Sequence, residues 1–224
     1  TSAACAVPSA AEAADLARAA QRAVAARRLD RPYTMLEVGA GIFALPAAEV
    51  CPTSLDRCAT AETSLALGVR NFYRTGPFAL GAGITWATTL GADSARGDPD
   101  LERDHSRRYF LVEALFRYAV YRDDEWEWWG GGSFGGIIVN DSWSVRADRE
   151  PVDDVAFVGP RSTTVGTEGL TAGIAGGGEW SFATNLSAGV TLRYMNWFLP
   201  GNPGSSPTAD VASLSGRVDT FELG

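Results

Sequence analysis

The chain has 224 residues, with 19 basic and 27 acidic side chains, a formal net charge of -8 and a sequence pI of about 4.7. The length suits one β-barrel domain, and the acidity argues against a nucleic-acid partner, because phosphate binding needs a clustered basic surface. No apolar run reaches the roughly 18 to 20 residues of a transmembrane helix, and the mean hydropathy is only -0.05.

The first segment differs from the rest of the sequence. Ser9 and Glu12 form a capping box, and Ala, Leu and Arg dominate up to Leu29, which predicts one α-helix. We assign residues 1–32 to an N-terminal periplasmic helical segment and residues 33–224 to a barrel domain. Because the chain begins at Thr1 without a basic and apolar leader, we expect that a signal peptide has been removed.

The chain has three cysteines. Cys51 and Cys58 bracket a short polar segment, and their spacing predicts a disulfide-closed loop in an oxidising compartment. Cys5 is left over, either as a free thiol, as a lipidated residue or as a bond to another chain. No metal site is expected, because the single histidine, His105, lies far away in the sequence.

Segments of about ten residues alternate between apolar side chains and small, polar or charged ones. In residues 186–194, Leu186, Val190 and Leu192 share one face of a strand, whereas Gly189 and Arg193 share the other. A polar face that is rich in small residues and carries single charges is typical of a narrow barrel whose apolar surface faces lipid.

The same alternation predicts eight strands, at residues 34–45, 64–74, 78–88, 109–121, 126–139, 170–180, 186–198 and from about 213 onward. Residues 109–121 also fit a helix, and strand is preferred for the aromatic and β-branched content. Residues 91–108 and 141–168 are predicted as long loops. The connections alternate strictly between short and long, as in outer-membrane barrels with short periplasmic turns and long external loops. Aromatic residues near the strand ends predict interfacial girdles, with Trp86, Tyr109, Trp197 and Phe198 on the long-loop side.

The last strand reads SLSGRVDTFELG and stops just as its pattern begins. An open edge in lipid leaves backbone groups unpaired. We therefore expect either that the native chain continues for a few residues or that this strand is short and shifted toward one rim.

Over residues 33–224, this pattern resembles the small bacterial outer-membrane barrels, the superfamily of the OmpA transmembrane domain and the opacity proteins. The resemblance rests on the pattern and not on a signature motif. It implies an all-β fold, an eight-stranded antiparallel transmembrane β-barrel with periplasmic termini, here preceded by one N-terminal α-helix, and a location in the outer membrane of a Gram-negative bacterium.

Strand parity turns seven charged side chains toward the lumen, which in an eight-stranded barrel is just filled by side chains. Buried opposite charges must pair, so we expect a salt-bridge network that seals the lumen, formed by Glu37, Arg70, Glu113, Arg117, Glu127, Glu179 and Arg193. The alternative is a gated polar path for ions or small solutes.

The sequence predicts a non-enzymatic barrel with a structural or surface-interaction role and no cofactor. The expected partners are outer-membrane lipid and lipopolysaccharide, and another envelope protein that binds the external loops or the N-terminal helix. Asp104, His105 and Ser106 are the one place where a lipid-modifying enzyme could arise, but side chains of sequence neighbours diverge. The alternatives are therefore a narrow pore or transporter, and a barrel enzyme.

Overall fold

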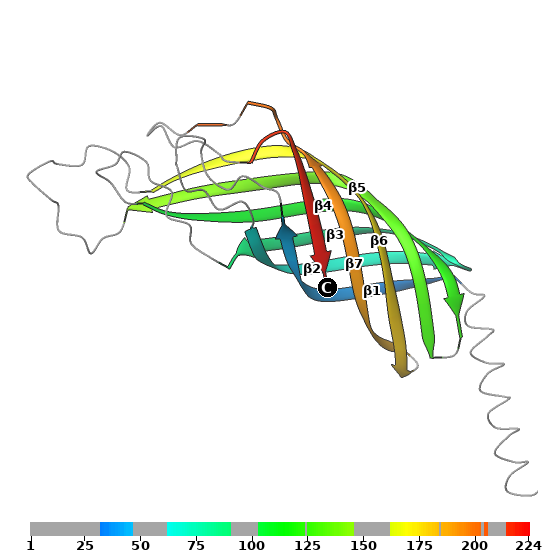
Figure 1. Ribbon diagram of the computed structural model, residues 1–224. Helices are drawn as coiled ribbons and strands as arrows, with labels where there is room; N and C mark the ends of the chain where they lie inside the picture. Colours follow the sequence, from blue (N-terminus) through cyan, green and yellow to red (C-terminus); the bar gives the residue numbers. More distant parts are fainter. Residues whose placement is uncertain are drawn as a thin grey trace, which may run out of the picture.

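The computed structural model describes residues 32–46, 62–90, 103–123, 125–145, 162–183, 185–202, 204–205 and 214–224. In this part of the chain, eight antiparallel strands close into a barrel, with each strand paired to its sequence neighbours and β8 paired to β1 (Figure 1). The strands are β1 (Tyr33–Leu45), β2 (Glu62–Thr75), β3 (Phe78–Thr89), β4 (Arg103–Arg122), β5 (Trp126–Val145), β6 (Ser162–Ala183), β7 (Leu186–Phe198) and β8 (Arg217–Leu223). The predicted all-β, eight-stranded antiparallel fold is confirmed.

Two predictions fall outside the described residues. They are the N-terminal helix of the segment 1–32 and the disulfide between Cys51 and Cys58. Within the described residues, no helix is long and apolar enough to cross a membrane.

Side chains alternate between the outer surface and the lumen in every strand. The outer surface carries large apolar residues, such as Val38 at 74% and Leu80 at 63% exposure, while the lumen-facing Phe72 and Leu111 are fully buried. A water-soluble protein rarely exposes contiguous apolar surface on this scale. The outward side chains therefore form an apolar band around the barrel.

The short connections are built from tight turns. Gly76 has a φ of 57° in the β2–β3 turn, a backbone conformation that glycine adopts without a Cβ clash. In the β4–β5 turn, the Asp123 carboxylate accepts hydrogen bonds from the backbone N–H groups of Glu125 and Trp126, at 2.9 and 2.6 Å. β6 and β7 are also joined by two residues, so the connections after β2, β4 and β6 are short and those after β1, β3, β5 and β7 are long. The predicted alternation of short and long connections is therefore present in the structure.

Aromatic side chains gather on the outer surface near the short turns. The exposed members include Tyr73, Phe78, Tyr121, Trp126, Trp128 and Trp180. Trp126 stacks between Trp128 and Trp180, with ring centroids 6.5 and 6.4 Å away, which is typical of an interfacial girdle. On the long-loop side the prediction is wrong for Tyr109 and Trp197, which are fully buried, because their strand parity turns them into the lumen.

The predicted loops at 91–108 and 141–168 are too long. β4 begins at Arg103, β5 continues to Val145 and β6 begins at Ser162, so these three strands are the longest arrows in Figure 1. The sequence prediction failed because the outward residues of these strand extensions are polar and give no apolar face to recognise.

The last strand is short and lies toward the long-loop rim, which is one of the two predicted alternatives. β8 pairs with seven residues of β7, from Leu192 to Phe198, but with only Ile42, Phe43 and Ala44 of β1. Figure 1 shows the end of β8 beside β1, where Leu223 pairs with Ile42 in the last part of that strand.

Candidate functional site

The lumen is the candidate site, because most of the described buried charges lie there. At its centre, Arg70 donates hydrogen bonds to Glu37 at 2.8 Å and to Glu222 at 2.7 Å. Arg193 donates to the other oxygen of Glu222 and to Glu113, each at 2.7 Å. Glu222 of β8 thus joins an arginine of β2 to an arginine of β7. All of these groups except the partly exposed Glu37 are nearly inaccessible to solvent.

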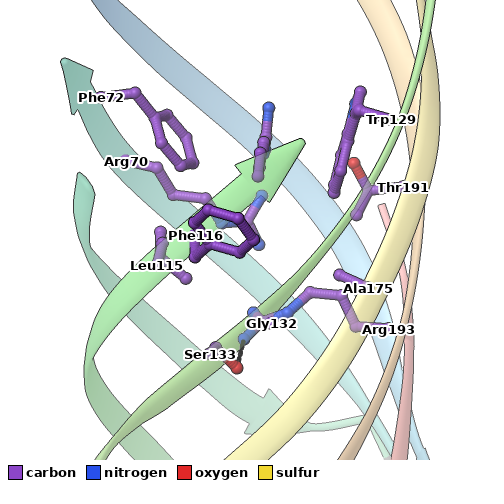
Figure 2. A pocket seen from close by; sticks show the side chains of 11 residues that line it. Arg70, Phe72, Leu115, Phe116, Trp129, Gly132, Ser133, Ala175, Thr191 and Arg193 are labelled. Carbon is purple, nitrogen blue, oxygen red and sulfur yellow. Dashed lines mark hydrogen bonds between the residues drawn. The ribbon is translucent and has the colours of Figure 1, made fainter. Parts of the chain in front are cut away.

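Arg117 links this cluster to a further carboxylate. Its guanidinium donates to Glu37 at 2.6 Å and to Glu179 at 2.9 Å. It also lies 4.2 Å from the ring centroid of Phe72 and 3.8 Å from that of Trp129, so that two aromatic rings add cation–π attraction. Figure 2 shows Phe72 and Trp129 around the small void at this level, whose volume is about 20 Å³, room for one water molecule.

A second cluster lies near the short turns. Glu127 pairs with Arg74 at 2.6 Å and with Arg122 at 3.2 Å, and it stands opposite Glu179 in the β5–β6 register. Of the seven predicted lumen charges, the structure brings six into the central network and puts Glu127 in this separate cluster. All seven side chains lie on the lumen side of their strands.

The predicted network lacked three members of these clusters, namely Arg74, which the strand pattern had allowed to face inward, Arg122 and Glu222. Glu222 was missed because the eighth strand had no firm register, although its alternation with Val218 and Thr220 was a usable signal. With these residues included, the two clusters hold five arginines and five glutamates. The balance matters, because an unpaired charge buried in a barrel costs several kcal/mol.

An apolar layer fills the lumen on the long-loop side of the charges. Phe43, Leu111, Met195 and Trp197 are fully buried there. Trp197 packs edge-on against Phe43 with ring centroids 6.2 Å apart, and against Tyr109 at 5.1 Å. An apolar layer therefore follows the charge clusters along the lumen.

A third layer of polar groups lies beyond the apolar one, at the long-loop rim. The Asp141 Oδ1 atom accepts from Arg107 Nε at 2.8 Å and lies 2.7 Å from His105 Nε2. Arg107 and the Tyr109 hydroxyl both donate to Glu62. His105 is also stacked on Trp143, with ring centroids 5.0 Å apart.

These contacts correct the prediction that His105 lies in the long loop at residues 91–108. His105 belongs to β4 and is 4% exposed, whereas Ser106 points to the opposite, outer face. The carboxylate beside His105 comes from Asp141 on the neighbouring strand. Among the described residues, no group of three His, Cys, Asp or Glu side chains is arranged to hold a metal ion.

The Asp141 carboxylate should make the rim sensitive to acid. Burial opposes its charge, but the hydrogen bond to His105 and the charge of Arg107 together hold its pKa below the ordinary value of 3.8. Because the pKa of Asp141 is lowered in the folded state, its charged carboxylate stabilises the fold at every pH above its ordinary pKa. This stabilisation is lost as the pH falls through the lowered pKa. We expect the thermal midpoint of the wild type to fall more steeply between about pH 5 and pH 2 than that of Asp141→Asn. Parallel curves would show that other carboxylates carry the acid response.

Comparisons with known proteins give similarity at the level of structure. No protein-family model matches the chain, and no curated protein matches it. Among solved structures, the chain is similar to Neisserial surface protein A (NspA), at 12% identity and a TM-score of 0.48, over 86% of this chain and 92% of that one. It is also similar to Ail, the attachment invasion locus protein of Yersinia pestis, at 14% identity and a TM-score of 0.43, over 85% and 94%. A second structure of Ail, in complex with the heparin analogue sucrose octasulfate, gives the same values.

Proposed function

We propose that the chain is a bacterial outer-membrane β-barrel with a structural or surface-interaction role and a lumen that does not conduct. The outward apolar band and the inward charges support a barrel that faces lipid. The connections after β2, β4 and β6 are short and the others long, which favours turns in the periplasm and loops outside the cell.

The observation that carries the closed lumen is its apolar layer. An ion crossing the barrel has to pass the level of Phe43, Leu111 and Trp197, which are fully buried inside the lumen. A cavity of about 400 Å³ lies between β1 and β7 beside Glu37, Ser187 and Glu222, and Phe43, Leu111 and Trp197 do not line it. The seal thus combines the predicted salt bridges with an apolar layer that the sequence did not reveal.

Conductance in planar lipid bilayers tests the closed lumen. We expect neither the wild type nor Arg117→Ala to show stepwise currents, because the apolar layer is unchanged when the charge cluster is broken. The triple variant Arg117→Ala/Phe43→Ala/Trp197→Ala breaks the charge cluster and removes two of the largest side chains from the apolar layer, and it is the matched variant in which currents are expected. Steady currents through the wild type would favour the narrow pore instead.

The geometry gives the enzyme alternative no support. His105 is engaged by Asp141 and Trp143 and faces the lumen, while Ser106 faces outward, so these neighbours do not form a nucleophile and base pair. A partner protein that binds the external loops or the N-terminal helix stays a prediction, because those segments lie outside the described residues.

A further inference from the structure

The strands β4, β5 and β6 continue past the apolar band as a three-stranded sheet. On β5 the last large apolar outward residue is Ile138, and the strand runs on to Val145. At about 3.3 Å per residue, the six residues from Ile138 to Ser144 span roughly 20 Å. A strand tilt of about 40° turns this length into a height on the order of 15 Å above the band.

The outer face of this extension carries six hydroxyl and amide side chains, and Arg108, Gly166 and Glu168 lie on its side nearest the apolar band. We call it the hydroxyl face and define it as Ser106, Asn140, Ser142, Ser144, Ser162 and Thr164. Cross-strand register places Ser106, Ser142 and Thr164 in one row. The Ser142 and Thr164 hydroxyls are 2.9 Å apart.

One cation lies where the hydroxyl face meets the apolar band. Arg108 is exposed, pairs with Asn140 in the register and lies one outward position above Phe110. Most of the other described arginines point into the lumen and are buried or partly buried. Arg108 therefore lies directly beyond the edge of the apolar band, where a lipid that covers the band would place its phosphate.

The inner side of the extension holds this face rigid. Arg107 and His105 of β4 both bind Asp141 of β5, and Trp143 stacks on His105. A surface that is already fixed loses little conformational entropy when a ligand binds.

On the basis of the proposed function, we infer that the hydroxyl face binds the saccharide headgroup of an outer-leaflet glycolipid and that Arg108 binds a phosphate of that headgroup. A lipid whose acyl chains cover Phe110 and Ile138 has to place its headgroup against Arg108 and Asn140, because these positions follow directly along the same strands. Serine, threonine and asparagine side chains both donate and accept hydrogen bonds, as sugar hydroxyls do. A guanidinium is well suited to a phosphate.

A protein partner fits this face less well. Protein interfaces depend on buried aromatic, Met and Arg anchors, and the hydroxyl face has no aromatic side chain. Its height, on the order of 15 Å, instead matches a headgroup of several sugars rather than the head of a simple phospholipid.

The test uses the 224-residue chain folded in zwitterionic micelles and titrated with dye-labelled probes. The probes are purified lipopolysaccharide that carries core sugars and, for comparison, phosphatidylglycerol. We expect tighter binding of the lipopolysaccharide. The variant Ser106→Ala/Ser142→Ala/Thr164→Ala should weaken lipopolysaccharide binding about tenfold, since each of several hydrogen bonds contributes modestly, and should leave phosphatidylglycerol binding unchanged. Arg108→Gln should weaken the binding of both lipids, because both carry phosphate.

The matched control removes three exposed hydroxyls at the opposite end of the barrel, as Thr34→Ala/Thr75→Ala/Ser181→Ala. It should bind lipopolysaccharide like the wild type. Equal affinity of the wild type for the two lipids, or an unchanged affinity of the hydroxyl-face variant, would overturn the inference. Insertion into lipid vesicles is measured on the same preparations. A chain that fails to insert would contradict the proposed function. A chain that inserts but binds the two lipids equally would contradict this inference alone.

Discussion

Replacing Arg193 by Gln is expected to cost about 3–5 kcal/mol of folding free energy, the range for breaking a buried ion pair on one side. Arg193 is 3% exposed, donates to both Glu113 and Glu222, and also reaches Ser133 at 3.1 Å. Figure 2 shows the contact with Ser133 as a dashed line. Without the guanidinium, Glu113 is left as a buried carboxylate that has lost its partner, and Glu222 keeps only Arg70. Urea unfolding in lipid vesicles, followed by heat-modifiable gel mobility, measures the loss.

Two further variants separate the ion pair from a general loss of packing. Arg193→Gln/Glu113→Gln removes both charges of one pair and should recover part of the stability, because neighbouring sites that share an interaction are not additive. Arg217→Gln is the surface control, since Arg217 is largely exposed and lies 3.6 Å from Asp219, and it should change stability by less than about 0.5 kcal/mol. A double variant as unstable as the sum of its single changes would contradict this account.

Replacing Gly135 by Ala is expected to destabilise the barrel by about 3 kcal/mol or more, at the upper end for overpacking. A Cβ on this lumen-facing residue would lie 2.0 Å from the carbonyl oxygen of Val112. Because that oxygen belongs to the neighbouring strand, relief requires β4 and β5 to move apart. We expect Gly135→Ala to lower both the yield of folded protein and the urea midpoint.

The next residue supplies the control. Gly136 faces outward, and a Cβ there would meet only the Gly169 carbonyl oxygen at 3.8 Å, an ordinary contact. Gly136→Ala should be neutral or stabilising by about 0.4–1 kcal/mol, because alanine restricts the unfolded chain. If both substitutions had the same effect, the cause would be β-propensity rather than the close approach of the two strands.

Alternation was enough to predict the architecture, because a period of two fixes which side of a strand each residue faces. The inward placement of Arg70 and Arg117 follows directly from the apolar residues on either side of them. The partners of these charges could not be derived in the same way. Which glutamate meets which arginine depends on the stagger of strands that are far apart in sequence, as for Arg70 and Glu222.

The strand extensions show where alternation fails. In residues 140–144 both faces carry polar side chains, so the segment was predicted as a loop. Its lumen-facing residues are Asp141 and Trp143, whose partners are on β4. The apolar layer was missed for a different reason. Tyr109 and Trp197 were assigned to the girdle from their position along the strand, although their parity already pointed inward.

The rigid sheet formed by β4, β5 and β6 has a consequence for engineering. A foreign peptide inserted between Val145 and Ser162 would follow strands that run roughly 20 Å past the apolar band, on a support whose inner side is tied by Arg107 and Asp141. In the orientation that we propose, the barrel is thus suited to the display of an epitope outside the cell. Antibody access would not depend on the length of the inserted linker.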